Sequence, residues 1–172
     1  MTRAWAIRVA VALAVVGLTV SAASADAGTT NLSARLSGFS EVPPQLTAGS
    51  GTLHATVRGN TLTYKLTFSD LSSTATQSHI HFAQSGVNGA VVVFLCGSAA
   101  TPGPAGTPTC PADGGTVTGT ITAAQVLAVP AQGVTAGDFA GLVRIIRSGD
   151  AYANVHTTAH PGGEIRGQVH VD

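Results

Sequence analysis

Charged side chains are scarce in this sequence, and those present form no cluster of one sign. Lysine and arginine number 8, aspartate and glutamate number 8, and charged residues make up 9% of the chain. A nucleic-acid-binding surface needs a patch of basic side chains, because phosphate contacts supply most of its affinity. The composition therefore excludes a nucleic-acid partner. A cationic amphipathic helix, which would indicate binding to a lipid surface, is also missing.

The sequence also lacks an apolar run long enough to cross a membrane near its start. The uncharged stretch 9–20 spans twelve residues, whereas a membrane helix needs about 20. Arg3 and Arg8 provide a positive region, and the small residues 23–25 (Ala-Ser-Ala) suit signal peptidase. This layout predicts a cleavable signal peptide rather than an anchor, with no membrane insertion after cleavage. The expected division of the chain is a signal peptide over 1–25, a flexible leader over 26–31 and one domain over 32–172.

Cysteine is almost absent. Cys96 and Cys110 are the only two, and they flank a loop rich in proline, glycine and threonine. Neither belongs to a C-x-x-C pair, which makes a pair of metal-ligating thiolates the less favoured interpretation. In an exported protein, an even pair across a flexible loop predicts a disulfide. We therefore expect a Cys96–Cys110 bridge in a protein that is secreted or periplasmic.

The common signatures of hydrolytic enzymes are missing too. No G-x-S-x-G elbow accompanies the serines, and no second carboxylate stands beside Glu164 for glycosidase chemistry. Glu164 and Arg166 are two apart on a predicted strand and so share a face. The structural interpretation of this pair is an ion pair with each other or with Glu41, and a catalytic role is the alternative. No residue is assigned as catalytic.

Apolar and polar residues alternate through most of the chain, which is typical of half-buried strands. The clearest case is 53–57 with 62–68, joined by the turn residues Gly59 and Asn60. This turn pairs Val57 with Leu62. Further strands are expected at 32–37, 79–82, 90–95, 116–121, 151–157 and 164–171.

Two short helices are expected between the strands. Thr122 and Gln125 fit a capping box before one of them. Asp138 is positioned to cap a second, amphipathic helix that Gly149 ends. Many short strands with glycine-rich turns predict an all-β fold, an antiparallel Greek-key-like sandwich or barrel with one or two short helices.

Histidines occupy the non-core positions of two predicted strands. His79 and His81 alternate with apolar residues, and their rings are expected roughly 6 to 7 Å apart along one face. His156 lies on the polar face of another strand, and His160 follows in a turn. If the strands are neighbours, these four imidazoles converge into a site suited to copper or zinc. The alternative is that the histidines are structural and fix strands and loops by hydrogen bonding.

Four segments of the sequence together resemble the CHRD domain, which occurs as a repeat in chordin and singly in many bacterial secreted proteins. The matching pieces are LSGFSEVPP (36–44), GTLHATVRGNTLTYKLTFSDL (51–71), SHIHFAQSGVNGAVVVFLC (78–96) and GDAYANVHTTAHPGGEIRGQV (149–169). The resemblance covers nearly all of the predicted domain. It implies that the motif residues Glu41, Pro43, His79, His81, Asn154, His156, Glu164 and Arg166 form the site, with His160 in a looser part of the pattern.

The resemblance implies a binding or structural module rather than a defined reaction. In chordin the domain belongs to an extracellular antagonist of growth-factor signalling, which also uses cysteine-rich modules that this chain lacks. The His-x-His strand is also similar to the copper-ligand strand of copper-zinc superoxide dismutase, whose later zinc-loop ligands are missing here. We expect an exported, non-enzymatic module, with copper or zinc as the candidate cofactor and an extracellular protein or small ligand as partner. The alternatives are a metal-dependent redox enzyme of the cell envelope and a protein-interaction module with structural histidines.

Overall fold

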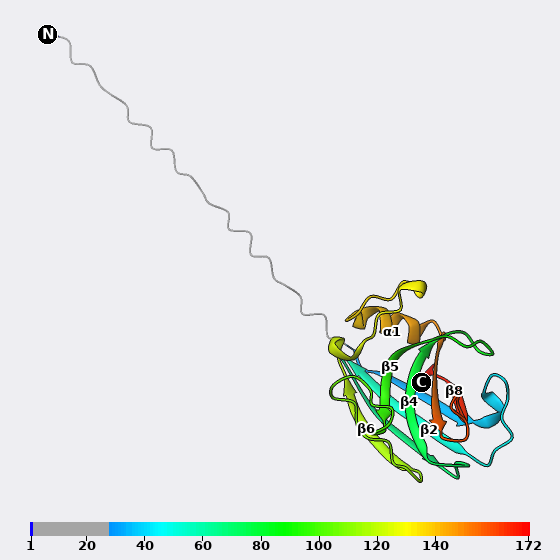
Figure 1. The fold of residues 1–172 in the computed structure, drawn as a ribbon. Coiled ribbons are helices and arrows are strands. Elements are labelled where there is room, and N and C mark those ends of the chain that lie inside the picture. Colours follow the sequence, from blue (N-terminus) through cyan, green and yellow to red (C-terminus); the bar gives the residue numbers. More distant parts are fainter. Residues whose placement is uncertain (2–27) are drawn as a thin grey trace.

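In a computed structural model, the described residues form one strongly curved antiparallel sheet with a single α-helix at one end (Figure 1). The structure describes Met1 and residues 28–172, so the predicted signal peptide lies outside the described residues apart from Met1. No helix in the described part has the length and apolar character that crossing a membrane requires. The strands are β1 (Thr30–Ser37), β2 (Ser50–Arg58), β3 (Thr61–Ser69), β4 (Ala75–Phe82), β5 (Ala90–Gly97), β6 (Gly115–Ile121), β7 (Ala151–Thr157), β8 (Ile165–Gln168) and β9 (His170–Val171), and the helix is α1 (Phe139–Arg147).

The sheet curls until it almost closes. Its strand order is β5-β4-β7-β8-β1-β2-β3-β6, every pair is antiparallel, and β9 pairs with β1 beside β8. The Tyr64 hydroxyl on β3 donates a hydrogen bond to the Leu95 carbonyl on β5, across the barrel. The end strands β5 and β6 come into contact. The expected all-β fold is therefore confirmed, in its barrel-like form.

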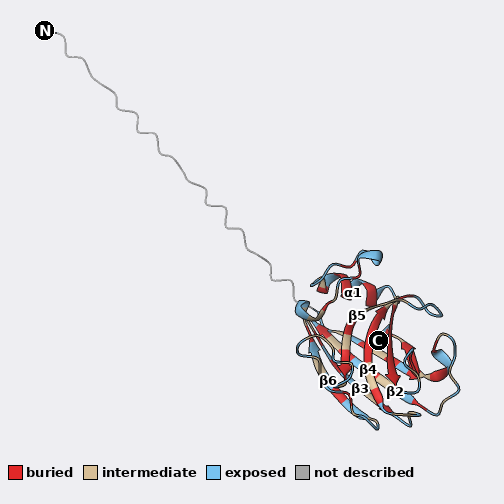
Figure 2. Ribbon diagram, in the orientation of Figure 1, coloured by how far each residue is buried: buried red, intermediate tan, exposed pale blue. Residues whose placement is uncertain are grey.

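The core fills the inside of this barrel. Alternate residues of each strand point inward, and Leu53, Leu66, Ile80 and Ile165 are among the most deeply buried (Figure 2). The amphipathic helix α1 adds its apolar face to the same core. Glycine at 167 allows β8 to approach β1 closely, because a Cβ there would lie 2.0 Å from the Arg35 carbonyl oxygen.

The hairpin and both predicted caps are confirmed. Val57 pairs with Leu62 across the β2–β3 turn, as the alternation predicts. The Asp138 side chain accepts a hydrogen bond from the Gly141 N–H at the start of α1. The capping box at Thr122 is present, but it caps a 3₁₀ turn (Ala123–Gln125) rather than an α-helix. Further 3₁₀ turns lie at Gly38–Ser40 and Pro130–Gln132.

Two boundaries differ from the sequence-based expectation. β1 begins at Thr30, so the last two residues of the predicted leader belong to the sheet. The strand expected over 164–171 is divided at Val169, whose N–H bonds to the Ala151 carbonyl while β9 pairs with β1. Alternation alone does not reveal that a strand changes its partner.

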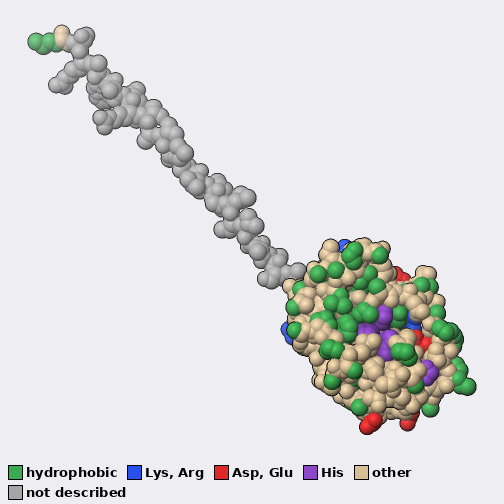
Figure 3. Space-filling model, in the orientation of Figure 1, with side chains coloured by type: hydrophobic (Ala, Val, Ile, Leu, Met, Phe, Trp, Pro, Cys, Tyr) green, Lys and Arg blue, Asp and Glu red, His purple; other side chains and the backbone are tan. Residues whose placement is uncertain are grey.

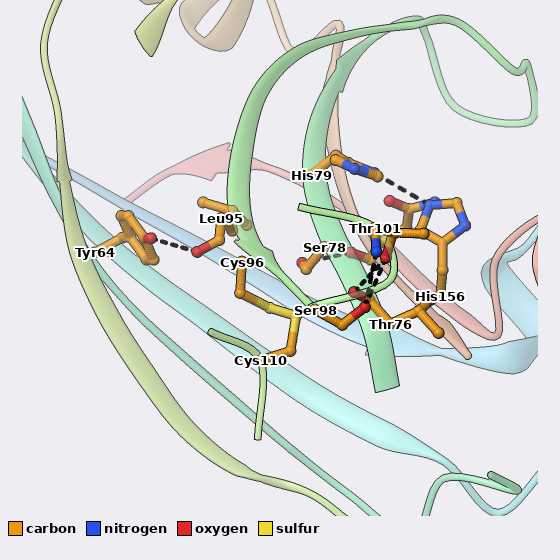
Figure 4. The surroundings of a disulfide bond; sticks show 11 residues. Tyr64, Thr76, Ser78, His79, Leu95, Cys96, Ser98, Thr101, Cys110 and His156 are labelled. Carbon is orange, nitrogen blue, oxygen red and sulfur yellow. Dashed lines mark hydrogen bonds between the residues drawn. A yellow bond between two sulfur atoms is a disulfide. The ribbon is translucent and has the colours of Figure 1, made fainter. Parts of the chain in front are cut away.

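The predicted disulfide is present and joins the end of β5 to the far side of the loop that follows (Figure 4). Closing a loop of 14 residues restricts the unfolded chain. We expect the Cys96→Ala/Cys110→Ala variant to lose about 3 kcal/mol of unfolding free energy in urea denaturation. Reductant should lower the midpoint of the wild type and leave that of the variant unchanged. Equal stabilities of the two proteins would contradict the prediction.

Candidate metal centre

Three adjacent strands place the predicted site residues side by side. β4, β7 and β8 are neighbours, and their register aligns His79 with Asn154 and Asn154 with Arg166. His81 pairs with Tyr152 in the same way. The inward-pointing residues between them belong to the core, so these polar side chains lie together on the outer face of the barrel.

The three histidines of these strands converge, as expected. His79, His81 and His156 each offer a ring nitrogen within 4.8 Å of the other two. His79 Nδ1 lies 3.2 Å from His156 Nε2. Figure 3 shows histidine side chains gathered on the face seen there, beside basic and acidic side chains.

Two backbone carbonyls fix the orientation of two of these rings. His81 Nδ1 lies 2.9 Å from the Gly89 carbonyl oxygen, and His156 Nδ1 lies 2.9 Å from that of Pro161. A carbonyl only accepts hydrogen bonds, so both Nδ1 atoms carry the proton. Both Nε2 atoms therefore present lone pairs toward the centre. A second hydrogen bond of this kind is how proteins usually orient histidine ligands of metals.

His79 has a nitrogen with no partner. His79 Nδ1 donates to the lone pair of His156 Nε2, which leaves a lone pair on His79 Nε2 that is buried and has no hydrogen-bond partner. Buried polar atoms rarely lack a partner, and coordination of an ion is one of the recognised explanations. Asn154 Oδ1 lies 3.1 Å from His81 Nε2. Because His81 donates from Nδ1, a neutral His81 requires the Asn154 amide to be turned by about 180°, so that its NH₂ group donates to the Nε2 lone pair.

Burial keeps these imidazoles neutral. Desolvation, followed by repulsion from the neighbouring histidines, lowers the pKa of His79 to about 3. Desolvation also lowers the pKa of His81 to about 4 and that of His156 below its ordinary value. Neutral imidazole is the form that binds metals, so no proton has to be removed from an imidazolium at neutral pH.

The polar face predicted from the alternation is not exposed to solvent. His79, His81 and His156 are only 2%, 7% and 7% exposed. The loops 83–89 and 158–163 lie against this face, since their carbonyls bond to His81, His156 and Arg166. The Phe94 ring meets His79 edge-on, with centroids 4.3 Å apart. Alternation sorts side chains between faces but does not show which face a loop covers.

A stack of side chains extends the site across the sheet. Tyr152, on the middle strand, stacks in parallel on His81 with ring centroids 4.5 Å apart. The Arg166 guanidinium, from the strand on the other side, lies 3.3 Å from the centroid of the same tyrosine ring. Tyr152 and Phe94 are the parts of the site that the sequence analysis did not single out. Their strand positions, opposite His81 and His79, are the signal that identifies them.

Glu164 and Arg166 do not form the predicted ion pair. Among the described residues, the one ion pair joins Arg144 to Asp138. Arg166 donates to the Gln84 and Val87 carbonyls and to Asn88 Oδ1. Glu164 precedes the first residue of β8 and accepts four hydrogen bonds elsewhere, from the Ser72 N–H and from the hydroxyls of Ser72, Thr47 and Thr157.

Glu41 and His160 lie beside the three-histidine group and are not part of it. His160, the fourth predicted ligand, is absent from the converging set and lines a small cavity of about 200 Å³ together with Glu41. Glu41 is 5% exposed, and its Oε1 has no hydrogen-bond partner. Desolvation raises the pKa of Glu41 to about 7, against the opposing effects of the Val42 backbone N–H and of Arg166.

The donor types suit a transition-metal ion. His79 Nδ1 and His156 Nε2, 3.2 Å apart, share a proton in the metal-free protein. An ion would therefore bind His79 through the lone pair of Nε2 or, after the proton moves to Nε2, through Nδ1. Imidazole donors suit copper and zinc, whereas calcium and magnesium prefer oxygen. The residues therefore fit either of the metals that the sequence suggested.

The fold and the site define the class of this protein, a barrel-like all-β domain with a buried histidine group on its outer face. The CHRD domain family matches residues 32–169, and the chain belongs to that family. Comparison with curated proteins gave no match, and comparison with solved structures gave none either. Membership in the CHRD family supports a structural or binding module.

Proposed function

We propose that this CHRD domain is an exported, non-enzymatic module that binds copper or zinc through His79, His81 and His156. The observation that carries the proposal is the convergence of three neutral imidazoles, one of which has a buried nitrogen without a partner. Histidines with a purely structural role would instead have their hydrogen-bonding capacity met within the protein. The Cys96–Cys110 disulfide is compatible with an oxidising destination, periplasm or medium.

A protein-interaction module with structural histidines is the second candidate. His81 and His156 each bond a loop carbonyl, and these contacts alone would hold the two loops on the sheet. A redox enzyme, the third possibility, additionally needs an open coordination position for substrate. The first two functions differ in whether the folded protein retains metal.

We expect the purified protein, exposed to copper and zinc and then dialysed exhaustively, to retain close to one metal ion per chain in elemental mass spectrometry. The His79→Ala/His81→Ala variant should retain almost none, because it loses two of the three donors. Its matched control is His54→Ala/His170→Ala, which removes two exposed histidines outside the group. Circular dichroism checks that each variant is folded.

Two results would contradict the proposal. If the folded wild-type protein retains no metal, the histidines have a structural role instead. Equal metal contents in the His79→Ala/His81→Ala variant and the control would place the bound metal elsewhere.

A further inference from the structure

The donor set of the three-histidine group carries no charge. Among the described residues, no carboxylate oxygen or cysteine sulfur joins the group, and both cysteines are held in the disulfide. The three imidazoles are neutral and neutralise none of the charge of a bound ion. A divalent ion would therefore keep both of its positive charges, whereas a monovalent ion would keep one.

The surroundings disfavour concentrated positive charge. The guanidinium of Arg166 is 2% exposed and lies against Tyr152, whose ring stacks on His81. Moving an ion out of water costs a free energy that rises with the square of its charge, so a divalent ion costs about four times as much as a monovalent one of similar size. Glu41 opposes Arg166 only in part, because it is outside the donor group and burial favours its protonated form.

The number of donors and the side chains packed around the site also disfavour a divalent ion. Structural zinc is almost always four-coordinate, and cupric copper prefers square-planar or tetragonal surroundings. Three histidines leave such an ion to recruit water. The Phe94 ring, however, packs edge-on against His79, and the free His79 Nε2 has no solvent contact. Cuprous copper, with a filled d shell, accepts three neutral donors without a water ligand.

We infer that the three-histidine group binds copper as Cu(I) in preference to Zn(II) and Cu(II). This inference rests on the proposed metal-binding function and adds the oxidation state of the metal. A divalent ion carries one more positive charge than Cu(I), and the Arg166 guanidinium repels that charge. At a separation of several ångströms and an effective dielectric constant of about 20, one additional unit charge lowers the affinity for the ion roughly 10- to 100-fold. A preference of at least that size is expected for Cu(I) over Zn(II).

The test is a pair of anaerobic competition titrations on the whole protein. In one, Cu(I) is shared with a chromogenic cuprous chelator; in the other, Zn(II) is shared with a zinc-binding dye. We expect Cu(I) to bind with one-to-one stoichiometry and to displace most of the bound Zn(II) when added in equal amount. Reoxidation in air should then release copper or weaken its binding by at least 10-fold.

A single-atom change tests the electrostatic reason. Asn154→Asp keeps the size of the side chain and places a carboxylate beside His81 Nε2, which the wild-type amide approaches within 3.1 Å. We expect this variant to bind Zn(II) at least about 10-fold more tightly than the wild type and to lose most of the preference for Cu(I). His54→Asp, an exposed change on β2, is the control and should leave both affinities unchanged.

The outcomes separate the inference from the proposed function. Retention of Zn(II) or Cu(II) more tightly than Cu(I) would overturn the inference and leave the metal-binding function standing. Failure of the folded wild-type protein to hold any of the three ions would overturn both. If the Asn154→Asp variant does not fold, the wild-type competition still decides the question.

Discussion

Acidification from pH 7.5 to pH 4.5 is expected to remove several kcal/mol of unfolding free energy from the metal-free protein. The cause is the buried histidine group. In the unfolded chain these imidazoles take up protons near their ordinary pKa of 6.5, whereas in the folded protein the pKa of His79 is about 3 and that of His81 about 4. Between those values the unfolded chain binds more protons, so stability is fully present above pH 6.5 and falls as the pH is lowered.

The size of the effect follows from the same shifts. Each pKa unit corresponds to 1.36 kcal/mol, so His79 and His81 together contribute on the order of 5 kcal/mol by pH 4.5, comparable with the total stability of many domains. Glu41 acts in the opposite direction, because its raised pKa means that the folded protein takes up its proton first as the pH falls. One carboxyl does not offset the group of histidines.

The measurement is urea denaturation at pH 7.5, 6.0, 5.0 and 4.5 in the presence of a chelator. We expect stability to fall by about 2 kcal/mol per pH unit near pH 5.5. His79→Gln/His81→Gln should flatten this slope even if it lowers stability at neutral pH, and His54→Gln/His170→Gln should leave the slope as it is. A wild-type stability that stays constant from pH 7.5 to pH 5 would refute the prediction.

Replacement of Glu164 by alanine is expected to lower the unfolding free energy by about 3 to 5 kcal/mol. The side chain is fully buried, and its two oxygens accept four hydrogen bonds of 2.6 to 2.8 Å from three separate segments. Burial alone would raise the pKa of this carboxyl, but these donors lower it below the ordinary value. The alanine variant leaves the Ser72 N–H and three hydroxyls without their acceptor, and among these donors the Thr157 hydroxyl is buried.

A graded series identifies the cause. Glu164→Gln keeps the shape and one acceptor oxygen, so it should cost about 1 to 2 kcal/mol. Asp113→Ala removes an exposed carboxylate and should change stability by less than about 0.5 kcal/mol. Urea denaturation at pH 7.5 provides all three values. An alanine variant as stable as the Asp113 control would show that the hydrogen bonds to Glu164 do not stabilise the fold.

The fold was largely predictable because most of its strands alternate regularly. The β2–β3 hairpin combined a two-residue turn with alternation on both sides, and the observed pairing agrees. Convergence of His79, His81 and His156 was predicted from the same alternation, on the condition that β4 and β7 were neighbours. They are neighbours, although nothing in the local sequence requires it.

The remaining features depend on contacts between distant segments. The anchoring carbonyls of Gly89 and Pro161 are backbone atoms and leave no signature in residue type. The Glu164–Arg166 pair was misread because Glu164 lies before β8 begins, where the rule that residues two apart share a face no longer applies. Each side chain then reaches its own set of partners in a different loop.

Because Tyr152 stacks on His81, metal binding at His81 can be followed by the absorption and fluorescence of the protein itself. The sequence has two tyrosines, and Trp5, its single tryptophan, lies in the predicted signal peptide. In a protein expressed without residues 1–25, near-ultraviolet absorption and emission therefore come mainly from Tyr64 and Tyr152. An ion at His81 perturbs a phenol ring 4.5 Å away, whereas Tyr64 is hydrogen-bonded to Leu95 elsewhere in the barrel and serves as an internal reference. Tyr64→Phe isolates the reporting chromophore, so that occupancy of the site can be followed without an added dye.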